Sequence, residues 1–500
     1  MIFLKDTILN KLQSNPVAQQ MLQFGNNIGN LFPNEEALCM ASAFMQDQQT
    51  RIVVKKNRYE AQQLYQRLKP LINDTLLFVM EESLRVQAIA SSPEDKQEQL
   101  YVLTQLVKED KPRIIICNTA AFLRYLPDKE LFKSLCYKFE VDQEITMAEL
   151  KQKLNRAGYT KVNYVDRPCT YASRGGIVDV YCLEYEHPIR IEFFDTVIES
   201  IRLFHEETQR TIQTIDSVLI NPATDLLFTD DQIEYLQKEI DSELEKQQVK
   251  LIQDDYDFLL DYIEKDKISI ENYNIDPHLY IYFSYLNANK LTDYVNGHII
   301  FSSQEEVESG YKKLNEETIS FIQEMVESHQ YLPKYCMFHD ILTFEKEHTI
   351  QMFHDFLDFK HPIFSNIETL EQSDQPLIQI LENLKGENIY ISLDEEHTKK
   401  VQEALKAYSI HRNITFIKDD FYEGFTYEDI SVYTQQELFH HPSQIKRYQK
   451  TFKQGQILQN ILELEPNDYV VHEQYGIGQY VGITTRKIKG KTLDYLHVLY

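Results

Sequence analysis

The chain has 500 residues, of which 43% are hydrophobic and 26% are charged. At about 150 residues per domain, this length predicts three to four domains with cores of their own. The formal net charge is −27, whereas a protein that holds DNA by electrostatic attraction is expected to carry a basic surface. The composition therefore favours protein partners and argues against these residues as the main contact to nucleic acid.

Neither a membrane segment nor a metal site is expected. No run of about 18 apolar residues occurs. The six cysteines are scattered without CxxC spacing, which is typical of reduced thiols in a cytoplasmic protein. One basic stretch, residues 444–456, is interpreted as the solvated face of a helix.

Residues 1 to about 125 alternate between strand and helix patterns. Strands are predicted at Ile52–Val54, Leu76–Val79 and Arg113–Cys117, and a helix is predicted at Tyr59–Leu68. Strands that alternate with helices in this way indicate a parallel α/β sheet.

A phosphate-binding loop in such a domain would follow the first strand, at residues 28–36. The motif GxxxxGK[ST] is absent there and elsewhere in the chain. Glu35 and Glu36 would repel a phosphate group. We therefore expect no cofactor in this chain and no ATP hydrolysis by it alone.

Three short antiparallel strands are predicted at Ile177–Cys182, Ile189–Phe194 and Ile198–Phe204. On the second strand, the alternation puts Arg190 and Phe194 on the face opposite the aliphatic residues. Arginine and aromatic side chains together on an outer face are typical of a protein interface. The alternative is that a helix of the same chain covers this face, and the pattern leaves both open.

Short blocks in this stretch, YxxRGGIxDVY, PIRIEFFD and QRT, resemble the second domain of the bacterial transcription-repair coupling factors (Mfd). That domain is related to part of the excision-nuclease B subunit, UvrB. In the family it docks on the A subunit, UvrA. The resemblance implies that Arg174, Arg190 and Phe194 contact UvrA.

Two blocks nearer the N-terminus, ASSPEDKQEQL and IIICNTAAFLRYLP, resemble the first domain of the same family. There the domain is similar to the UvrB motor lobe but has lost its ATP site. The missing phosphate loop therefore agrees with the coupling factors and differs from UvrB itself.

The last 37 residues, 464–500, contain a second specific motif, DYVVHxxxGIGxYxGI. A strand is predicted at Tyr469–His472, and Gly476 and Gly478 are expected to permit a tight loop. Short strands with glycine turns indicate a small barrel. The motif resembles the RNA-polymerase-interacting domain that the coupling factors share with CarD-type regulators, and which docks on the polymerase β subunit.

The resemblance implies a second set of contact residues, for RNA polymerase: Tyr469, His472, Gly476, Gly478, Thr485 and Arg486. Two positions differ from the family pattern. Tyr475 stands where histidine is common, and Arg486 stands where an aliphatic contact residue is usual. The second difference puts polymerase docking through that position in doubt.

The expected fold is a multidomain α/β architecture: a UvrB-like α/β domain without a phosphate loop, an α+β domain with an antiparallel sheet, a small α/β domain, and an incomplete SH3/Tudor-like β-barrel. The expected segments are 1–136 (first domain), 137–212 (UvrA-binding domain), 213–334 (return of the first domain), 335–441 (small α/β domain), 442–463 (helical connector) and 464–500 (truncated CarD-like domain). Within the returning segment, strands are predicted at Leu291–Val295 and His298–Phe301.

The chain stops at Tyr500 inside an alternating strand, so we expect it to be a fragment. In the family, the remaining part holds the motor that uses ATP and Mg²⁺ to translocate on double-stranded DNA. The resemblance implies a factor that couples stalled RNA polymerase to excision repair. Two alternatives stay open: a divergent UvrB-type subunit and a CarD-like transcription regulator without a repair role.

Overall fold

The computed structural model divides into two compact units, residues 1–445 and 446–500, each considered by itself. The structure describes the following residues: 4–23, 28–29, 31–82, 93–273, 277–334, 337–354, 363–371, 375–410, 412–418, 421–439, 469–472, 476–488 and 491–499. The predicted helical connector and the basic stretch at 444–456 lie outside the described residues.

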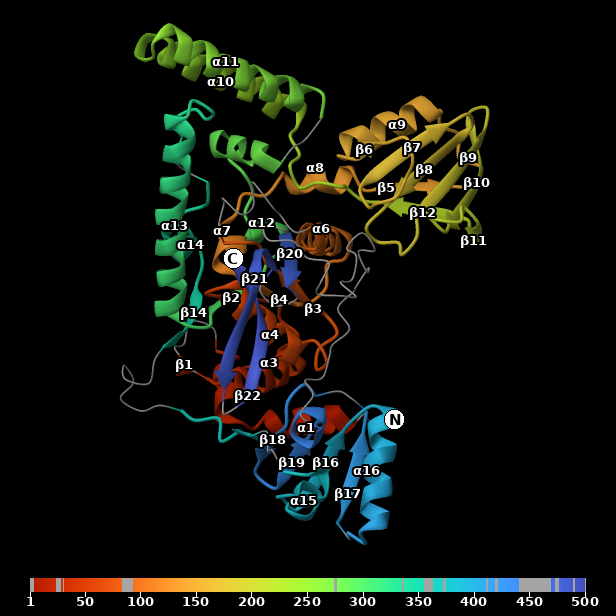
Figure 1. Cartoon of the computed structure of the whole chain (residues 1–500), viewed down its shortest axis with the longest axis vertical. Coiled ribbons are helices and arrows are strands. Elements are labelled where there is room, and N and C mark those ends of the chain that lie inside the picture. The colour runs from red at the N-terminus through yellow and green to blue at the C-terminus, as the bar shows by residue number, and fades with distance from the viewer. Residues whose placement is uncertain are drawn as a thin grey trace. The chain divides into compact units, whose positions relative to one another are not determined.

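A six-stranded parallel sheet forms the centre of the first unit (Figure 1). Its strands, in spatial order, are β1 (Ile28–Gly29), β14 (Ile350–His354), β13 (His298–Phe301), β2 (Arg51–Lys55), β4 (Ile114–Asn118) and β3 (Thr75–Phe78). Every neighbouring pair is parallel. The predicted parallel α/β sheet is confirmed.

Helices cover both faces of this sheet, which explains its continuous apolar strands. One core lies on the face of the sheet that carries Val53 and Ile300. It packs this face against α1 (Leu4–Leu12), α2 (Pro16–Gln20), α3 (Pro33–Asp47) and α4 (Arg58–Leu68). The other core packs Val54 and Phe301 against α6 (Pro93–Lys108), α7 (Thr119–Leu123) and α13 (Gln304–Glu327).

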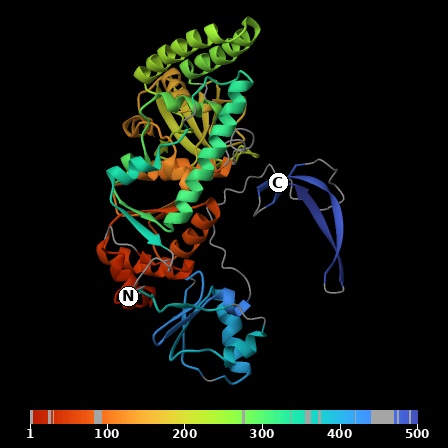
Figure 2. The ribbon, with the colours of Figure 1, turned by 90° about the vertical axis from the view of Figure 1, so that its left-hand side faces the viewer.

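Residues 230–271 form two long helices, α10 (Asp230–Lys250) and α11 (Gln253–Glu271), that lie side by side in Figure 2. They pack on the 3-10 helix η1 (Pro277–Tyr285). The remaining short helices of this part are α8 (Lys129–Ser134), α12 (Leu291–Tyr294) and α14 (Ile341–Glu347). The strand predicted at Leu291–Val295 is wrong: Leu291 and Tyr294 are both buried at helical spacing in α12.

A second, six-stranded sheet has the order β11 (Thr211–Ile215), β10 (Val197–Phe204), β9 (Ile189–Phe194), β8 (Ile177–Tyr181), β7 (Thr170–Arg174) and β6 (Thr160–Lys161). All of its pairs are antiparallel except β6–β7. The predicted three antiparallel strands are confirmed as β8, β9 and β10. A separate two-stranded ribbon joins β5 (Tyr137–Glu140) to β12 (Ser217–Ile220).

The third sheet is mixed and contains β15 (Glu368–Thr369), β18 (Phe425–Tyr427), β19 (Ile430–Tyr433), β16 (Asn388–Ser392) and β17 (Ile414–Ile417). Its helices are α15 (Leu377–Glu382), α16 (Glu395–Ala407) and α17 (Gln435–Phe439). Because β14 pairs with β13, residues 350–354 belong to the first sheet and not to the small domain where the sequence placed them. β14 adds to the first sheet as a parallel strand beside β13, and this pairing assigns residues 350–354 to that sheet.

The second unit contains three antiparallel strands, β20 (Tyr469–His472), β21 (Gly476–Ile488) and β22 (Lys491–Leu499). Gly476 pairs with His472 and Gly478 pairs with Val470. Both glycines are therefore strand residues, and the segment between the paired His472 and Gly476, where the tight loop is expected, lies outside the described residues. The order β20–β21–β22 is an open meander of three strands.

Candidate docking face and the edge of the parallel sheet

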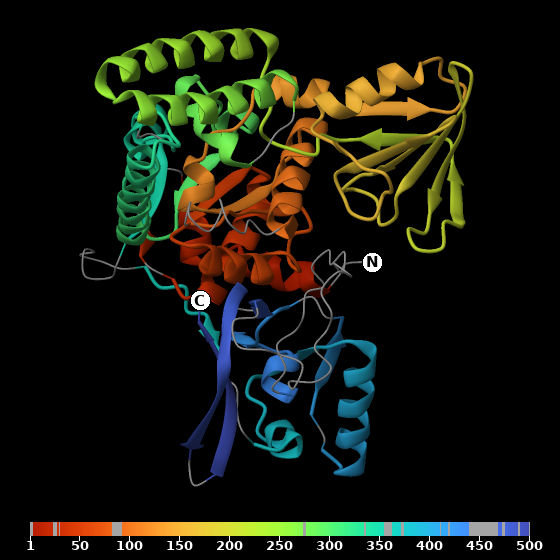
Figure 3. The same cartoon turned by 45° about the horizontal axis from the view of Figure 1, so that its top comes forward.

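The second-domain sheet has one face that packs on α9 (Met147–Arg156) and one that does not (Figure 3). The packed face contributes Ile189, Ile191 and Ile201 to a core with Leu150 and Leu154 of α9. α9 begins at a capping box in which the Thr146 hydroxyl accepts from the Glu149 amide. The helix thereby fixes which side of the sheet is buried.

The opposite side, which we call the outer face, is lined by alternate residues of β7 to β10. Strand register places Arg190 opposite Asp179 and Arg202, and it places Glu192 opposite Ile177. The residues that share this face are Arg174, Ile177, Asp179, Arg190, Glu192, Phe194, Arg202 and Phe204. The alternation on the second predicted strand is therefore confirmed, and no described helix of this domain covers the face.

Arg174 and Phe194 lie at the open end of the outer face. The Phe194 side chain is 74% exposed, and Arg174 is exposed as well. Arg174 ends β7 at a turn in which Gly175 has φ of +56°, a conformation that a side chain would strain. An exposed phenylalanine at the same end of a sheet face as an exposed arginine suits a partner that offers an apolar socket.

Arg190 lies four residues from Phe194 on the same strand, about 13 Å away along β9. Its guanidinium donates two hydrogen bonds to the Asp179 carboxylate, at 2.7 and 2.8 Å, and a third to the Gln209 side chain at 2.8 Å. The guanidinium carbon lies 4.3 Å from the centre of the Phe204 ring. The hydrogen bonds that Arg190 donates to Asp179 raise the pKa of Arg190 above its ordinary value.

These contacts lie at the other end of the outer face, which we call the closed end, and they join it to two loops. The Gln209 amide donates to the Tyr164 hydroxyl at 2.9 Å, and Val162 and Val165 pack on Ala172 and Tyr181. The structure thus brings Arg174 and Phe194 to one end and holds Arg190 in an internal network at the other.

A second charged pair lies on this face. Arg202 forms an ion pair with Glu192, and Glu192 also accepts a hydrogen bond from Ser200 at 2.8 Å. The alternation that exposed Arg190 and Phe194 also puts Glu192 and Arg202 on the outer face, so the signal was present in the strand pattern.

The carboxyl edge of the parallel sheet is the place where an α/β domain would hold a nucleotide. The Glu36 side chain occupies it: Glu36 is 2% exposed, its Oε2 lies 2.5 Å from Lys55 Nζ, and its Oε1 accepts from Ser302 Oγ at 2.6 Å. A neighbouring pocket between the ends of β2 and β4 and helix α13 has a volume of about 130 Å³. That volume is below the roughly 300 Å³ of small-molecule sites.

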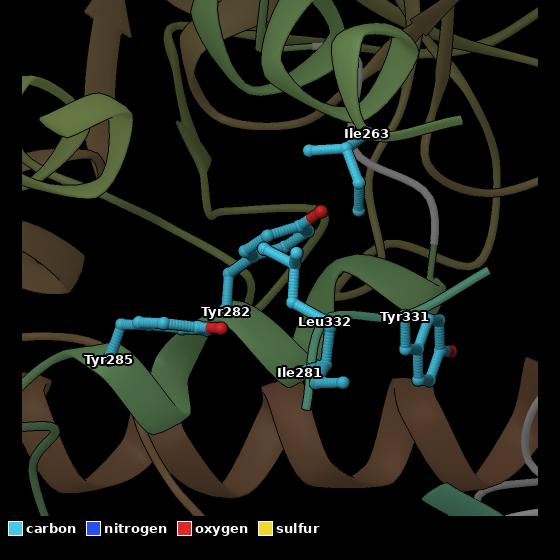
Figure 4. A pocket seen from close by; sticks show the side chains of 6 residues that line it. All are labelled: Ile263, Ile281, Tyr282, Tyr285, Tyr331 and Leu332. Carbon is cyan, nitrogen blue, oxygen red and sulfur yellow. The ribbon is translucent and has the colours of Figure 1, made fainter. Parts of the chain in front are cut away.

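Another pocket, under α11, is apolar and far smaller (Figure 4). It is lined by Ile263, Ile281, Tyr282, Tyr285, Tyr331 and Leu332 and encloses about 10 Å³, which is the space of about one water molecule. In the described ranges, no group of three or more histidine, cysteine or acidic side chains is arranged to hold a metal ion. Nor does any described helix combine the length and apolarity of a membrane span.

The six candidate polymerase contacts fall into two groups on the second unit. Tyr469, His472, Gly476 and Gly478 lie together on the paired ends of β20 and β21. Thr485 and Arg486 lie further along β21, opposite Asp494 and Leu493 of β22. Thr485 lies seven positions after Gly478, which is about 23 Å along a strand, so the strands alone do not bring the two groups together.

Two family models match this chain. The model described as the UvrB interaction domain matches residues 137–226, which include the outer face. The model described as the CarD-like/TRCF RID domain matches residues 464–500. These two matches place the chain in the class of proteins that combine a UvrB-type interaction domain with a CarD-like domain.

The curated relatives are more specific. The transcription-repair-coupling factor of Bacillus subtilis (strain 168) is 29% identical over 489 residues, which cover 90% of this chain and 41% of the relative. That of Staphylococcus haemolyticus (strain JCSC1435) is 26% identical over 511 residues, covering 94% and 43%. The predicted resemblance to the coupling factors is confirmed, and the chain spans about two fifths of the length of these relatives.

Proposed function

We propose that this chain supplies the adaptor surfaces of a transcription-repair coupling factor, which links stalled RNA polymerase to nucleotide excision repair. Two domain types in one chain support the proposal, a UvrB-type interaction domain and a CarD-like domain, together with relatives named as coupling factors that match 90% of the chain or more. The first recruits UvrA and the second binds the polymerase β subunit. The proposed location is the cytoplasm.

The single observation that carries the UvrA proposal is the open end of the outer face. Phe194 is 74% exposed at the end of a sheet whose other face is buried on α9. An aromatic residue left in water costs hydrophobic free energy that a partner's socket would recover. Arg174, Phe194 and Arg190 are the proposed UvrA contacts, with Arg190 acting partly through its network with Asp179.

Polymerase binding is proposed for residues 464–500, through Tyr469, His472, Gly476, Gly478, Thr485 and Arg486. Three antiparallel strands with unpaired outer edges among the described residues are compatible with an incomplete SH3/Tudor-like barrel. Translocation on double-stranded DNA, with ATP and Mg²⁺, is assigned to sequence that the relatives have beyond the matched region. This chain alone is proposed to be inactive as an ATPase.

The UvrB-type alternative would need a phosphate-loop lysine, which this sequence lacks. The stand-alone CarD-like regulator would have no use for a UvrB interaction domain. Equilibrium binding of the chain to purified UvrA, and separately to the polymerase β subunit, tests the proposal. Binding to both supports an adaptor, binding to polymerase only supports the regulator, and binding to neither contradicts the proposal.

A further inference from the structure

A buried carboxylate lies where the carboxyl ends of two central strands meet. Glu36 belongs to the first turns of α3, Lys55 is the last residue of β2, and Ser302 directly follows β13. The Lys55 side chain is 12% exposed and that of Glu36 is 3% exposed. An ammonium and a hydroxyl, both turned away from water, thus bind the two oxygens of one carboxylate.

The position is the one at which open α/β sheets bind ligands. β13 and β2 are parallel neighbours, with Phe301 opposite Val54. The chain leaves β13 toward β14 on one side of the sheet and leaves β2 toward β3 on the other. The crevice between strands whose connections diverge in this way is the usual ligand site of such sheets, and here Glu36 reaches into it.

We propose that Lys55 and Ser302 form an anion-binding site whose occupant is the Glu36 carboxylate of the same chain, and that a free small carboxylate can take its place when Glu36 is truncated. The donor pair has the chemistry for an anion, because a buried lysine left without its counter-charge is strongly unfavourable. Glu60 interacts electrostatically with Lys55 and with the acidic Glu306. Because Glu306 is paired with Lys56, the added negative charge near the site is that of Glu60, and it favours a singly charged ligand over phosphate.

Chemical rescue of the full chain tests this inference. Glu36→Ala removes one methylene and one carboxylate, which are the atoms that acetate returns. Removing one partner of a buried pair is expected to lower the thermal midpoint by about 5 to 10 °C. Sodium acetate at about 0.2 M should restore at least half of this loss relative to sodium chloride of equal ionic strength, by mass action on the folded state.

Two control variants separate site occupancy from general salt effects. Glu35→Ala removes the neighbouring half-buried carboxylate, which accepts from the Phe32 amide at 2.8 Å and from the Ser365 hydroxyl; it should lose stability without acetate rescue, because neither of the donors that it vacates carries a charge. Glu36→Gln keeps the site filled with a neutral amide, so it should lose stability and also resist rescue.

Equal midpoints for Glu36→Ala in acetate and in chloride would overturn the inference, as would equal acetate rescue of Glu35→Ala. Inorganic phosphate is the second probe, and a larger rescue by phosphate than by acetate would contradict the preference for a single charge. If Glu36→Ala does not fold, its refolding yield is compared in the two salts. A yield that rises only in acetate supports the site, and a yield that rises in neither contradicts it.

Discussion

The guanidinium of Arg190 is held in a two-pronged contact by the carboxylate of Asp179, with Nε 2.7 Å from Oδ1 and Nη2 2.8 Å from Oδ2. Asp179 lies on β8 and Arg190 directly opposite it on β9, so the pair also fixes the register of the two strands on the outer face. Because the arginine charge is already matched inside the chain, the exposed Phe194 and Arg174 are the more direct candidates for contact with a partner.

The Asp179 carboxylate is expected to stabilise the second domain. Its side chain is 7% exposed and that of Arg190 is 17% exposed, so Asp179→Asn should cost about 2 to 3 kcal/mol by leaving a half-buried arginine without its counter-charge. Hydrogen exchange of the β8 and β9 amides measures the loss. The matched control is Glu234→Gln, which breaks a 2.6 Å pair to Lys238 on the exposed surface of α10 and should cost at most about 0.5 kcal/mol. Similar costs for both variants would contradict the buried-pair argument.

A buried acid between the second domain and the parallel sheet predicts a pH dependence of stability. Burial alone would raise the pKa of Asp225, but the charges of Arg124 and Lys96 outweigh it and lower the pKa below its ordinary value. A lowered folded-state pKa adds stability that is present above the unfolded value, about 3.9, and that is lost as the pH falls through the folded value.

Asp225→Asn should therefore lower the free energy of unfolding at pH 7 by about 3 kcal/mol, because it removes the negative charge that pairs with the buried Arg124. The difference from the wild type should stay constant between about pH 7 and 5 and shrink below about pH 4. Urea unfolding of both proteins across this range measures it. A difference that grows on acidification would show that the carboxylate is not the stabilising form.

No ATP hydrolysis above background is expected from this chain. The Glu36 carboxylate fills the crevice at the sheet edge, and no phosphate-loop lysine is present. Release of labelled phosphate, with and without double-stranded DNA, measures the rate. A measurable rate that is abolished by substitutions around Gly29 would refute the expectation.

Arg486 is expected to weaken polymerase binding, because a charged side chain at an aliphatic contact position must be desolvated. Arg486→Leu should tighten binding to the polymerase β subunit by about 3- to 10-fold, that is by up to about 1.4 kcal/mol. The neighbouring Lys487→Leu is the control for added hydrophobicity. Equal gains from both substitutions would argue against a specific role of position 486.

Elements whose pattern is local were predictable. The period-2 alternation of β9 identified its buried face, and the alternation of strands with helices in the first domain indicated a parallel sheet. Features that depend on distant partners were not. Nothing local in residues 350–354 shows that they pair with β13, and the helix at 291–294 contains β-prone residues that tertiary burial makes helical.

The candidate site was predictable to the same extent. Alternation placed Arg190 and Phe194 on one face, but it could not show that Asp179 and Gln209 occupy the Arg190 side chain, because those contacts join different strands and a loop. Likewise, Glu36 was expected to repel phosphate, whereas its pairing with Lys55 and Ser302 depends on strands far apart in the sequence.

The central claim is that the open end of the outer face binds UvrA. The most direct measurement is the affinity of the chain for UvrA with Phe194→Ala, compared with Phe258→Ala, a phenylalanine on α11 that is 55% exposed outside this domain. The account predicts that Phe194→Ala weakens binding by at least about 30-fold, the effect of losing an aromatic anchor of about 2 kcal/mol, and that Phe258→Ala leaves it unchanged. Tight binding that survives Phe194→Ala would contradict the account.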